Sequence, residues 1–185
     1  MAWWIGPSSD NNANLKADMQ AASFCHDEFN IGMYCHLRHS RANEYNVPEE
    51  LTIKRCNEPQ DFADFGKVLA SVFHPVDEYV KIFYSKVQNI PEAERNNLKL
   101  FVGYVHDKPV STSGVFLTDV AGIYDVSTHP EMQNKGYGSA MFYKALKYAQ
   151  DTDIQYGVLQ ASPKGTSIYQ KFGFEQICTF NVWTP

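Results

Sequence analysis

The sequence lacks several features that would place it in other classes of protein. None of its apolar runs approaches the ~18 to 20 residues of a membrane-spanning helix, and no block rich in Lys and Arg interrupts it. Its 16 basic and 21 acidic residues give a net charge of -5, which offers little electrostatic support for binding nucleic acid. The first seven residues lack the basic and long apolar regions of a secretory signal. We therefore expect a soluble cytoplasmic protein that binds neither nucleic acid nor membrane.

Cysteine is scarce, and its spacing does not suggest disulfides or a metal site. The four cysteines are irregularly spaced, so reduced thiols are expected. Cys25-His26, Cys35-His36 and His39 carry zinc-binding side chains, but no CxxC is present. Adjacent residues on a strand point to opposite faces, which separates each Cys-His pair. We predict no metal.

The length and composition predict one sizeable core with an appendage. Of the 185 residues 44% are hydrophobic and 14% aromatic, which suits one ordinary globular domain. A polar stretch with a proline, residues 42–50, separates two more apolar regions, and we place a linker there. Residues 1–41 are too few to build a core alone and form the appendage, while 51–185 form the main domain.

The periodicity of apolar residues predicts a mixed α/β fold. Helical spacing is found in segments 15–24, 58–73, 76–87, 137–150 and 165–172. Runs of β-forming residues predict strands at 3–5, 29–37, 51–55, 98–106, 109–117, 121–128, 154–161 and 174–183. A tight turn at Asp107-Lys108 joins two of these runs, so the middle strands form an antiparallel meander. From residue 51 the order is βααβββαβαβ.

A glycine-bearing loop before the helix at 137–150 carries the clearest functional signal. The segment Gln133-Asn134-Lys135-Gly136-Tyr137-Gly138-Ser139 lies between a strand and the start of that helix. Unpaired amide groups at a helix start attract anions, and glycine lets a ligand approach the backbone, so the segment predicts a phosphate site. It is neither a Walker A loop nor a dinucleotide fingerprint, whose third glycine would stand where Met141 does. The alternative is that both glycines merely shape the turn.

The segment from Val126 to Ala140, with its His-Pro-Glu and Gln-x-x-Gly-x-Gly, resembles the signature of the GNAT superfamily of acyl-CoA-dependent N-acyltransferases. A second segment, Ile168-Tyr169-Gln170-Lys171-Phe172-Gly173-Phe174, is similar to the apolar-Tyr-x-Lys-x-Gly-Phe segment of that family. The element order over 51–185 matches as well. The resemblance implies the GNAT fold, a mixed, mostly antiparallel central sheet flanked by helices, and acetyl-CoA as co-substrate.

The resemblance also implies where the cofactor would bind. Backbone amides of the Gln133–Ser139 loop (Gln133, Asn134, Lys135, Gly136, Tyr137, Gly138 and Ser139) would hold the pyrophosphate of coenzyme A. The main chain of Val126, Ser127 and Thr128 would lie along the pantetheine arm like an added strand. In the family, the strands that match 121–128 and 154–161 splay apart to open the acyl-CoA cleft. Where the family often has an asparagine that bonds the arm, this chain has Ser162, whose reach is shorter.

The implied reaction is transfer of an acetyl group to a primary amine by direct attack in a ternary complex. Tyr169 matches the family tyrosine that protonates the leaving thiolate; the alternative is an aromatic residue that packs on the sheet. A water held by Asp125 or Tyr124 would accept the proton of the amine; the alternative for Asp125 is a solvated or hairpin-paired carboxylate. These two residues are adjacent on a strand, so we expect them to face opposite sides. His129 is expected to be structural or close to the phosphate.

The acceptor and the partners stay open at this stage. An amino acid, a polyamine, an antibiotic, a small aromatic amine or a peptide amine fits the reaction, and a homodimer is not excluded. Six aromatic residues could line an acceptor slot, although we expect most of them in the core: Phe73, Tyr79, Phe83, Tyr84, Phe180 and Trp183. The alternatives to an enzyme are a CoA-binding sensor without turnover and an interaction scaffold.

The first forty residues weakly echo the last thirty. Trp4-Ile5-Gly6-Pro7, a helix with Leu15, and a strand through Met33 parallel the segment from Leu159 to the final strand. The shared identities are few. We hypothesise that residues 1–41 are a degenerate partial GNAT repeat, as in tandem members of the family, and that both segments fold as strand-helix-strand units.

Overall fold

A computed structural model describes residues 2–10, 13–42 and 45–185, which form two compact units. One unit comprises residues 36–157, and the other joins residues 1–35 to residues 158–185. The strands and helices predicted from residue 51 onward occur in the predicted order, which confirms a mixed α/β fold. Two predicted loops contain short 3-10 helices, Leu37–His39 and Pro130–Met132.

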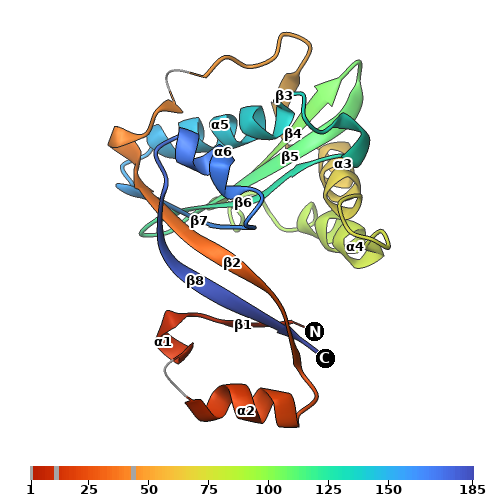
Figure 1. Ribbon diagram of the computed structural model, residues 1–185. Coiled ribbons are helices and arrows are strands. Elements are labelled where there is room, and N and C mark those ends of the chain that lie inside the picture. The colour runs from red at the N-terminus through yellow and green to blue at the C-terminus, as the bar shows by residue number, and fades with distance from the viewer. Residues whose placement is uncertain (1, 11–12, 43–44) are drawn as a thin grey trace. The chain divides into compact units, whose positions relative to one another are not determined.

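The unit of residues 36–157 is built on four antiparallel strands in the order β3-β4-β5-β6 (Figure 1). Their bounds are Thr52–Arg55 for β3, Leu98–Val105 for β4, Lys108–Leu117 for β5 and Ala121–Thr128 for β6. The helices are α3 (Pro59–Ala70), α4 (Glu78–Val87) and α5 (Tyr137–Gln150). Both α3 and α5 contact β4, β5 and β6.

Alternate residues of β4 show that the helices cover opposite faces of these strands. Leu100 and Val102 belong to a buried cluster with aromatic residues of α3 and α4. Phe101 points the other way, with its ring centroid 5.8 Å from that of Tyr148 in α5, and Val105 packs with Tyr137 of the same helix. The side-chain period of two along a strand produces this separation.

Helices α3 and α4 approach each other closely at Gly66. A Cβ atom there would lie 3.2 Å from both the Cα of Lys81 and the Cβ of Tyr84, so only glycine leaves room for the α4 backbone. Next to it, the rings of Phe65 and Tyr84 lie 4.5 Å apart between centroids. This contact fixes Tyr84 over the sheet, where it reaches β6.

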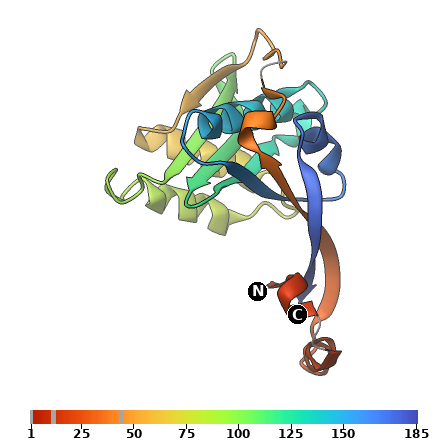
Figure 2. The same cartoon turned by 90° about the vertical axis from the view of Figure 1, so that its left-hand side faces the viewer.

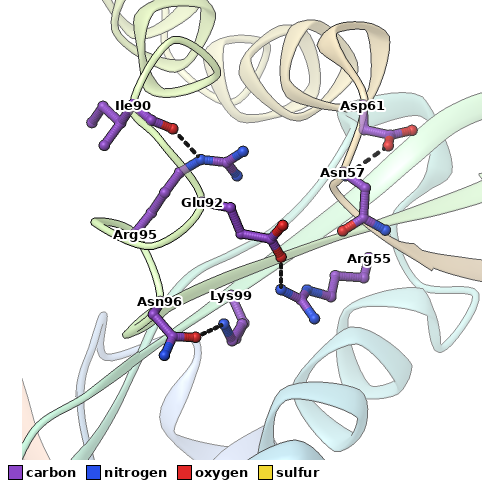
Figure 3. A network of polar contacts seen from close by, with 8 residues as sticks. All are labelled: Arg55, Asn57, Asp61, Ile90, Glu92, Arg95, Asn96 and Lys99. Atoms are coloured by element: carbon purple, nitrogen blue, oxygen red, sulfur yellow. Dashed lines mark hydrogen bonds and ion pairs between the residues drawn. The ribbon is translucent and has the colours of Figure 1, made fainter.

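Polar contacts hold the loop between α4 and β4 (Figure 3). Arg95 donates from Nε to the Ile90 carbonyl oxygen at 2.7 Å, and Lys99 donates from Nζ to Asn96 Oδ1 at 3.1 Å. Arg55 of β3 pairs with Glu92 at 3.4 Å between Nη2 and Oε1. Because these bonds reach β3 and β4, the end of α4 is fixed relative to the sheet.

The turn between β4 and β5 differs by one residue from the prediction at Asp107-Lys108. Val105 pairs with Lys108, so the two turn residues are His106 and Asp107. Both have positive φ, 49° and 60°, as a two-residue hairpin turn of type I′ requires. Histidine and aspartate adopt this conformation more readily than most residues other than glycine.

The other unit interleaves elements from both ends of the chain. Its elements are β1 (Trp3–Ile5), α1 (Pro7–Asp10), α2 (Ala13–Ala21), β2 (Cys25–His36), β7 (Tyr156–Ala161), α6 (Thr166–Lys171) and β8 (Glu175–Thr184). The strand order is β1-β8-β2-β7, and β8 pairs antiparallel with both β1 and β2. Figure 2 shows β2 and β8 running side by side as a long ribbon.

This order has the symmetry that an internal repeat requires. If β1 is exchanged with β7, and β2 with β8, the order becomes β7-β2-β8-β1, which is the observed order in reverse. The N-terminal segment has two helices, α1 and α2, between its strands, whereas the C-terminal segment has α6. The repeat itself, and the division into 1–41, 42–50 and 51–185, stay predictions; residues 1, 11–12 and 43–44 of these ranges lie outside the described residues.

Metal ions and membranes are two further possible partners. Within ranges 2–10, 13–42 and 45–185, no group of three His, Cys, Asp or Glu residues is placed to hold a metal ion. No helix in the same ranges combines the length and apolarity that crossing a bilayer would need. Cys35 and Cys56 are buried, whereas Cys25 is exposed.

The cluster between α3, α4 and the sheet should dominate the stability of its unit. Phe65 is fully buried there, so Phe65→Ala should lower the free energy of unfolding by about 3 to 5 kcal/mol. Phe83 is largely exposed, and Phe83→Ala should change it by less than about 1 kcal/mol. Denaturant unfolding of both variants measures the difference, and equal losses would contradict this view of the core.

Candidate active site

An irregularity in β6 shapes the centre of the candidate site. Gly114 pairs with Tyr124 and Thr112 pairs with Ser127, so β6 has one more residue than β5 between these pairs. Asp125 lies in this bulge with φ 53°, a left-handed conformation that is uncommon for residues other than glycine. The Thr112 hydroxyl donates to the Asp125 carbonyl oxygen at 2.8 Å and holds the bulge in place.

The bulge overturns the expectation that Tyr124 and Asp125 face opposite sides. Gly114, the partner of Tyr124, lies on the α3 and α4 face, where a Cβ atom would be 3.0 Å from Leu100 Cδ2. Asp125 reaches the same face, because it accepts a hydrogen bond from Tyr84 of α4. The extra residue breaks the alternation of a regular strand, so both side chains lie on one face.

Asp125 and Tyr84 form a coupled pair. The Tyr84 hydroxyl donates a short hydrogen bond to Asp125 Oδ2. Burial raises the pKa of the Asp125 carboxyl, and the bond from Tyr84 lowers it by a smaller amount. Burial and the neighbouring carboxylate both raise the pKa of Tyr84, which keeps the phenol protonated as a donor. The pair therefore presents a carboxylate whose proton affinity is greater than usual.

An open groove of about 380 Å³ leads to this pair. Its walls come from α3, α4, the loop between them and β6, and are lined by Leu69, Phe73, Asp77, Tyr79, Val80, Phe83, Tyr84 and Asp125. Tyr79 is 83% exposed and Phe83 60% exposed. The expectation that most aromatic residues of this region belong to the core is therefore wrong for Phe73, Tyr79 and Phe83, whereas Tyr84 is buried.

The glycine-bearing loop has the geometry expected of an anion site. Asn134 and Gly136 both have positive φ, 64° and 83°, and Gly136 precedes the first residue of α5. The first intrahelical bond runs from the Ala140 amide to the Gly136 carbonyl, so the amides of Tyr137, Gly138 and Ser139 precede the helical ladder. His129 is structural, since its Nδ1 accepts from the Glu131 amide at 3.4 Å and caps the 3-10 helix.

Some main-chain groups at the end of β6 point away from β5. His129 donates its amide to the Val110 carbonyl oxygen of the neighbouring strand. Because main-chain groups alternate along a strand, those of Ser127 also point toward β5, whereas those of Val126 and Thr128 point away. The Thr128 carbonyl oxygen accordingly accepts a hydrogen bond from Nε2 of Gln133 at 3.3 Å, not from β5. Lys135 is exposed beside Met132.

The segment interpreted as a linker contributes to this region. The Tyr45 hydroxyl donates to the Gly136 carbonyl oxygen at 2.9 Å and also interacts with the Ser139 side chain. Glu50 accepts a hydrogen bond from the Tyr137 hydroxyl at 2.8 Å. Sequence reasoning missed both residues. In the sequence, the one feature that could have indicated them is a tyrosine and a pair of glutamates within the polar stretch 42–50.

Tyr169 and Ser162 lie in the other compact unit, close to one another. Tyr169 is on α6, and a Cβ atom added at Gly165 would lie 3.5 Å from its ring and 3.4 Å from Ser162 Oγ. The helix ends at Lys171, and the φ of 91° at Gly173 permits the Phe174 amide to bond the Tyr169 carbonyl. Burial raises the pKa of Tyr169 to about 12. That Tyr169 meets Asp125 and the loop in one site stays a prediction.

Comparisons with known proteins agree with this geometry. A sequence family described as an acetyltransferase (GNAT) domain matches residues 55–177, about two thirds of the chain. None of the curated protein sequences compared with the chain matches significantly. The match covers β6, the loop and α5, as well as Tyr169.

Solved structures of low sequence identity share the fold. A GCN5-related N-acetyltransferase from Kribbella flavida has a TM-score of 0.70 at 12% identity; the alignment covers 98% of this chain and 66% of that one. A tandem GNAT protein from the clavulanic acid biosynthesis pathway has a TM-score of 0.66 at 10% identity, over 100% of this chain and 63% of that one. A predicted acetyltransferase from Clostridium acetobutylicum, solved with acetyl-CoA, has a TM-score of 0.56 at 16% identity; the alignment covers 69% of this chain and 91% of that one.

The raised pKa of Asp125 predicts a pH-dependent gain from its amide variant. The Asp125 carboxyl binds its proton more tightly in the folded protein than in the unfolded chain, where its pKa has the ordinary value of 3.8. Ionisation of Asp125 therefore lowers the free energy of unfolding as the pH rises above 3.8. Asp125→Asn removes this loss, keeps an oxygen to accept from Tyr84, and tolerates the left-handed backbone. We expect the variant to be more stable than the wild type near pH 7 and the gain to shrink toward about pH 4. Denaturant unfolding at both pH values tests this, and a gain that grows on acidification would contradict it.

Proposed function

Because the chain belongs to the GNAT acetyltransferase family, we propose that it transfers an acetyl group from acetyl-CoA to a primary amine of a small molecule or peptide. The observation that carries this proposal is the arrangement of β6 and α5. The main-chain groups of Val126 and Thr128 point away from β5, and after a 3-10 helix at Pro130–Met132 the chain reaches the glycine-bearing start of α5. Such a row of groups suits a ligand with amides at one end and a pyrophosphate at the other.

The residues present fit coenzyme A. The amides of Tyr137, Gly138 and Ser139 would bind the pyrophosphate, with Gln133, Asn134, Lys135 and Gly136 forming the wall of the loop. Val126, Ser127 and Thr128 would lie along the pantetheine arm, and Ser162 would supply a further hydroxyl contact. Tyr45 would hold the loop in shape through its bond to Gly136.

When bound, acetyl-CoA supplies a thioester whose acyl carbon bonds to the amine nitrogen as the carbon-sulfur bond breaks, with one proton from nitrogen passing to sulfur and one to solvent. The nitrogen must lose a proton first, because an ammonium ion has no free electron pair. Asp125, assisted by Tyr124 on the same face, would accept that proton directly or through water. Its raised pKa makes it a better base than an ordinary carboxylate.

Tyr169 is proposed to hold the proton for the leaving sulfur. With a pKa of about 12 the phenol stays protonated at neutral pH, so it is available as a donor in the resting enzyme. A backbone amide near Val126 or Ser127 would polarise the acyl oxygen. The alternative, a sensor that binds CoA without turnover, is favoured by Ser162 at the place of the usual asparagine and predicts binding without thiol release.

Gly138→Trp should abolish acetyl-CoA binding while the protein stays folded. A Cβ at position 138 would lie 3.2 Å from Thr128 Oγ1, so a large side chain fills the space between the loop and the end of β6. Unlike Gly136, Gly138 does not have positive φ, so the backbone tolerates the change. Calorimetric titration measures binding, for which micromolar affinity corresponds to about -8 kcal/mol.

Lys147→Trp, at the exposed far end of the same helix, is the matched control and should bind as the wild type does. No binding by the wild type would refute the proposed function. Binding that survives in Gly138→Trp, with circular dichroism unchanged, would move the cofactor away from α5.

Tyr169→Phe should leave acetyl-CoA affinity within about twofold and lower kcat by roughly 10 to 1000-fold, because only the proton donor is lost. Thiol release with an amine acceptor measures turnover, and calorimetry measures binding. Tyr156→Phe, at an exposed tyrosine outside the motif, is the control and should retain its rate. An unchanged kcat in Tyr169→Phe would show that the sulfur takes its proton from another group.

A further inference from the structure

Among the described residues, no basic side chain balances the charge of the Asp125 carboxylate. Within ranges 2–10, 13–42 and 45–185, the structure gives it one side-chain hydrogen-bond partner, the Tyr84 hydroxyl on Oδ2, and Asp125 lines the groove. Burial is the largest influence on its pKa, and no basic side chain contributes. A partly buried carboxylate without a counter-ion is costly unless a ligand supplies the positive charge. The ligand of this groove is therefore cationic at the end that reaches Asp125.

The rest of the groove is suited to a single positive charge. Its other acid, Asp77, caps α4: its Oδ1 accepts from the amides of Tyr79 and Val80, so the positive end of the helix already offsets part of its charge. A polyamine or an aminoglycoside would bring several ammonium groups to a groove with two carboxylates, one of which already faces a helix start. The groove therefore favours a monocation over a polycation.

The lining also disfavours acceptors that carry a carboxylate. None of the eight lining residues is Lys, Arg or His, so nothing there would pair with the acid group of an amino acid. A ligand carboxylate would instead be repelled by Asp125 and lose its hydration in an apolar wall. An amine without an acid group avoids both costs.

The exposed rings complete the description of the ligand. Phe73, Tyr79 and Phe83 are each at least 45% exposed and surround the approach to the carboxylate. Exposed aromatic side chains gathered in one groove gain free energy when a flat apolar group covers them, and their faces also attract a cation. A ligand with an ammonium at one end and an aromatic arm at the other satisfies both the rings and Asp125.

We propose that the acceptor is a monocationic primary amine with an apolar aromatic arm and no carboxylate, bound with its ammonium on Asp125 and its arm between Tyr79 and Phe83. This deepens the proposed function and rests on it. Asp125 thus binds the acceptor before it takes part in proton removal. Phe83 determines specificity through the arm.

The test uses the full chain and three probes: 2-phenylethylamine, L-phenylalanine and spermidine. The first two differ by one carboxylate, and the third has several charges and no ring. Calorimetry without acetyl-CoA measures binding, and thiol release with acetyl-CoA measures kcat/KM. We expect 2-phenylethylamine to bind at least about tenfold more tightly than either of the others and to be the best substrate.

Two variants locate the binding. Asp125→Asn, which keeps the bond from Tyr84, should weaken 2-phenylethylamine binding at least about tenfold, because the ammonium loses its counter-ion. Phe83→Ala should raise KM for this amine about tenfold with acetyl-CoA affinity unchanged. Ile82→Ala, at the adjacent and 48% exposed position of the same helix, is the matched control and should change neither value.

The outcomes separate this inference from the proposed function. Equal or tighter binding of L-phenylalanine or spermidine overturns the acceptor class, and so does 2-phenylethylamine binding that Asp125→Asn and Phe83→Ala leave unchanged. Absence of acetyl-CoA binding refutes the proposed function. Selective binding of 2-phenylethylamine that depends on Asp125 and Phe83 would then still support the groove as an amine site.

Discussion

The left-handed backbone at Asp125 is the constraint on which the site in the unit of residues 36–157 depends. One extra residue in β6, held by the Thr112 hydroxyl, turns the carboxylate toward α4 and brings Tyr124 to the same face. Beyond the bulge the strand resumes its pairing, so the main-chain groups of Val126 and Thr128 point away from β5. A regular strand would keep the alternation and place Tyr124 and Asp125 on opposite faces. The extra residue instead places Asp125 in the groove beside Tyr84.

The sequence predicted the elements well because each has a clear period. Apolar spacing placed α3, α4 and α5, and the glycines at 136 and 138 indicated the start of α5 as a ligand site. The bulge was not predictable, since the residues around Asp125 alternate as an ordinary strand does. Its partner was also hidden, because Tyr84 lies 41 residues earlier and the pair depends on tertiary packing.

Periodicity also misjudged how much of α4 is covered. The apolar spacing over 76–87 predicts a helix, but it does not tell how much of the apolar face of that helix packs on the sheet. Tyr84 and Val87 are buried against α3 and β4, whereas Phe83 lies just outside and lines the groove. Likewise, the composition of 42–50 indicated a linker, although Tyr45 and Glu50 bond to the start of α5. Polar composition says nothing about hydrogen bonds to a neighbouring loop.

The strand order of the other unit gives the first 36 residues a role that composition did not suggest. Strand β8 lies between β1 and β2, so, among the described residues, both of its ladder partners come from this N-terminal segment. The helix that carries Tyr169 leads directly into β8 and depends on how that strand is held. A chain trimmed to the family-matched residues 55–177 would lose β1 and β2 and most of β8 itself. The helix that carries Tyr169 would then end without the strand that anchors it, so changes in the N-terminal segment act on α6 although the two are far apart in the sequence.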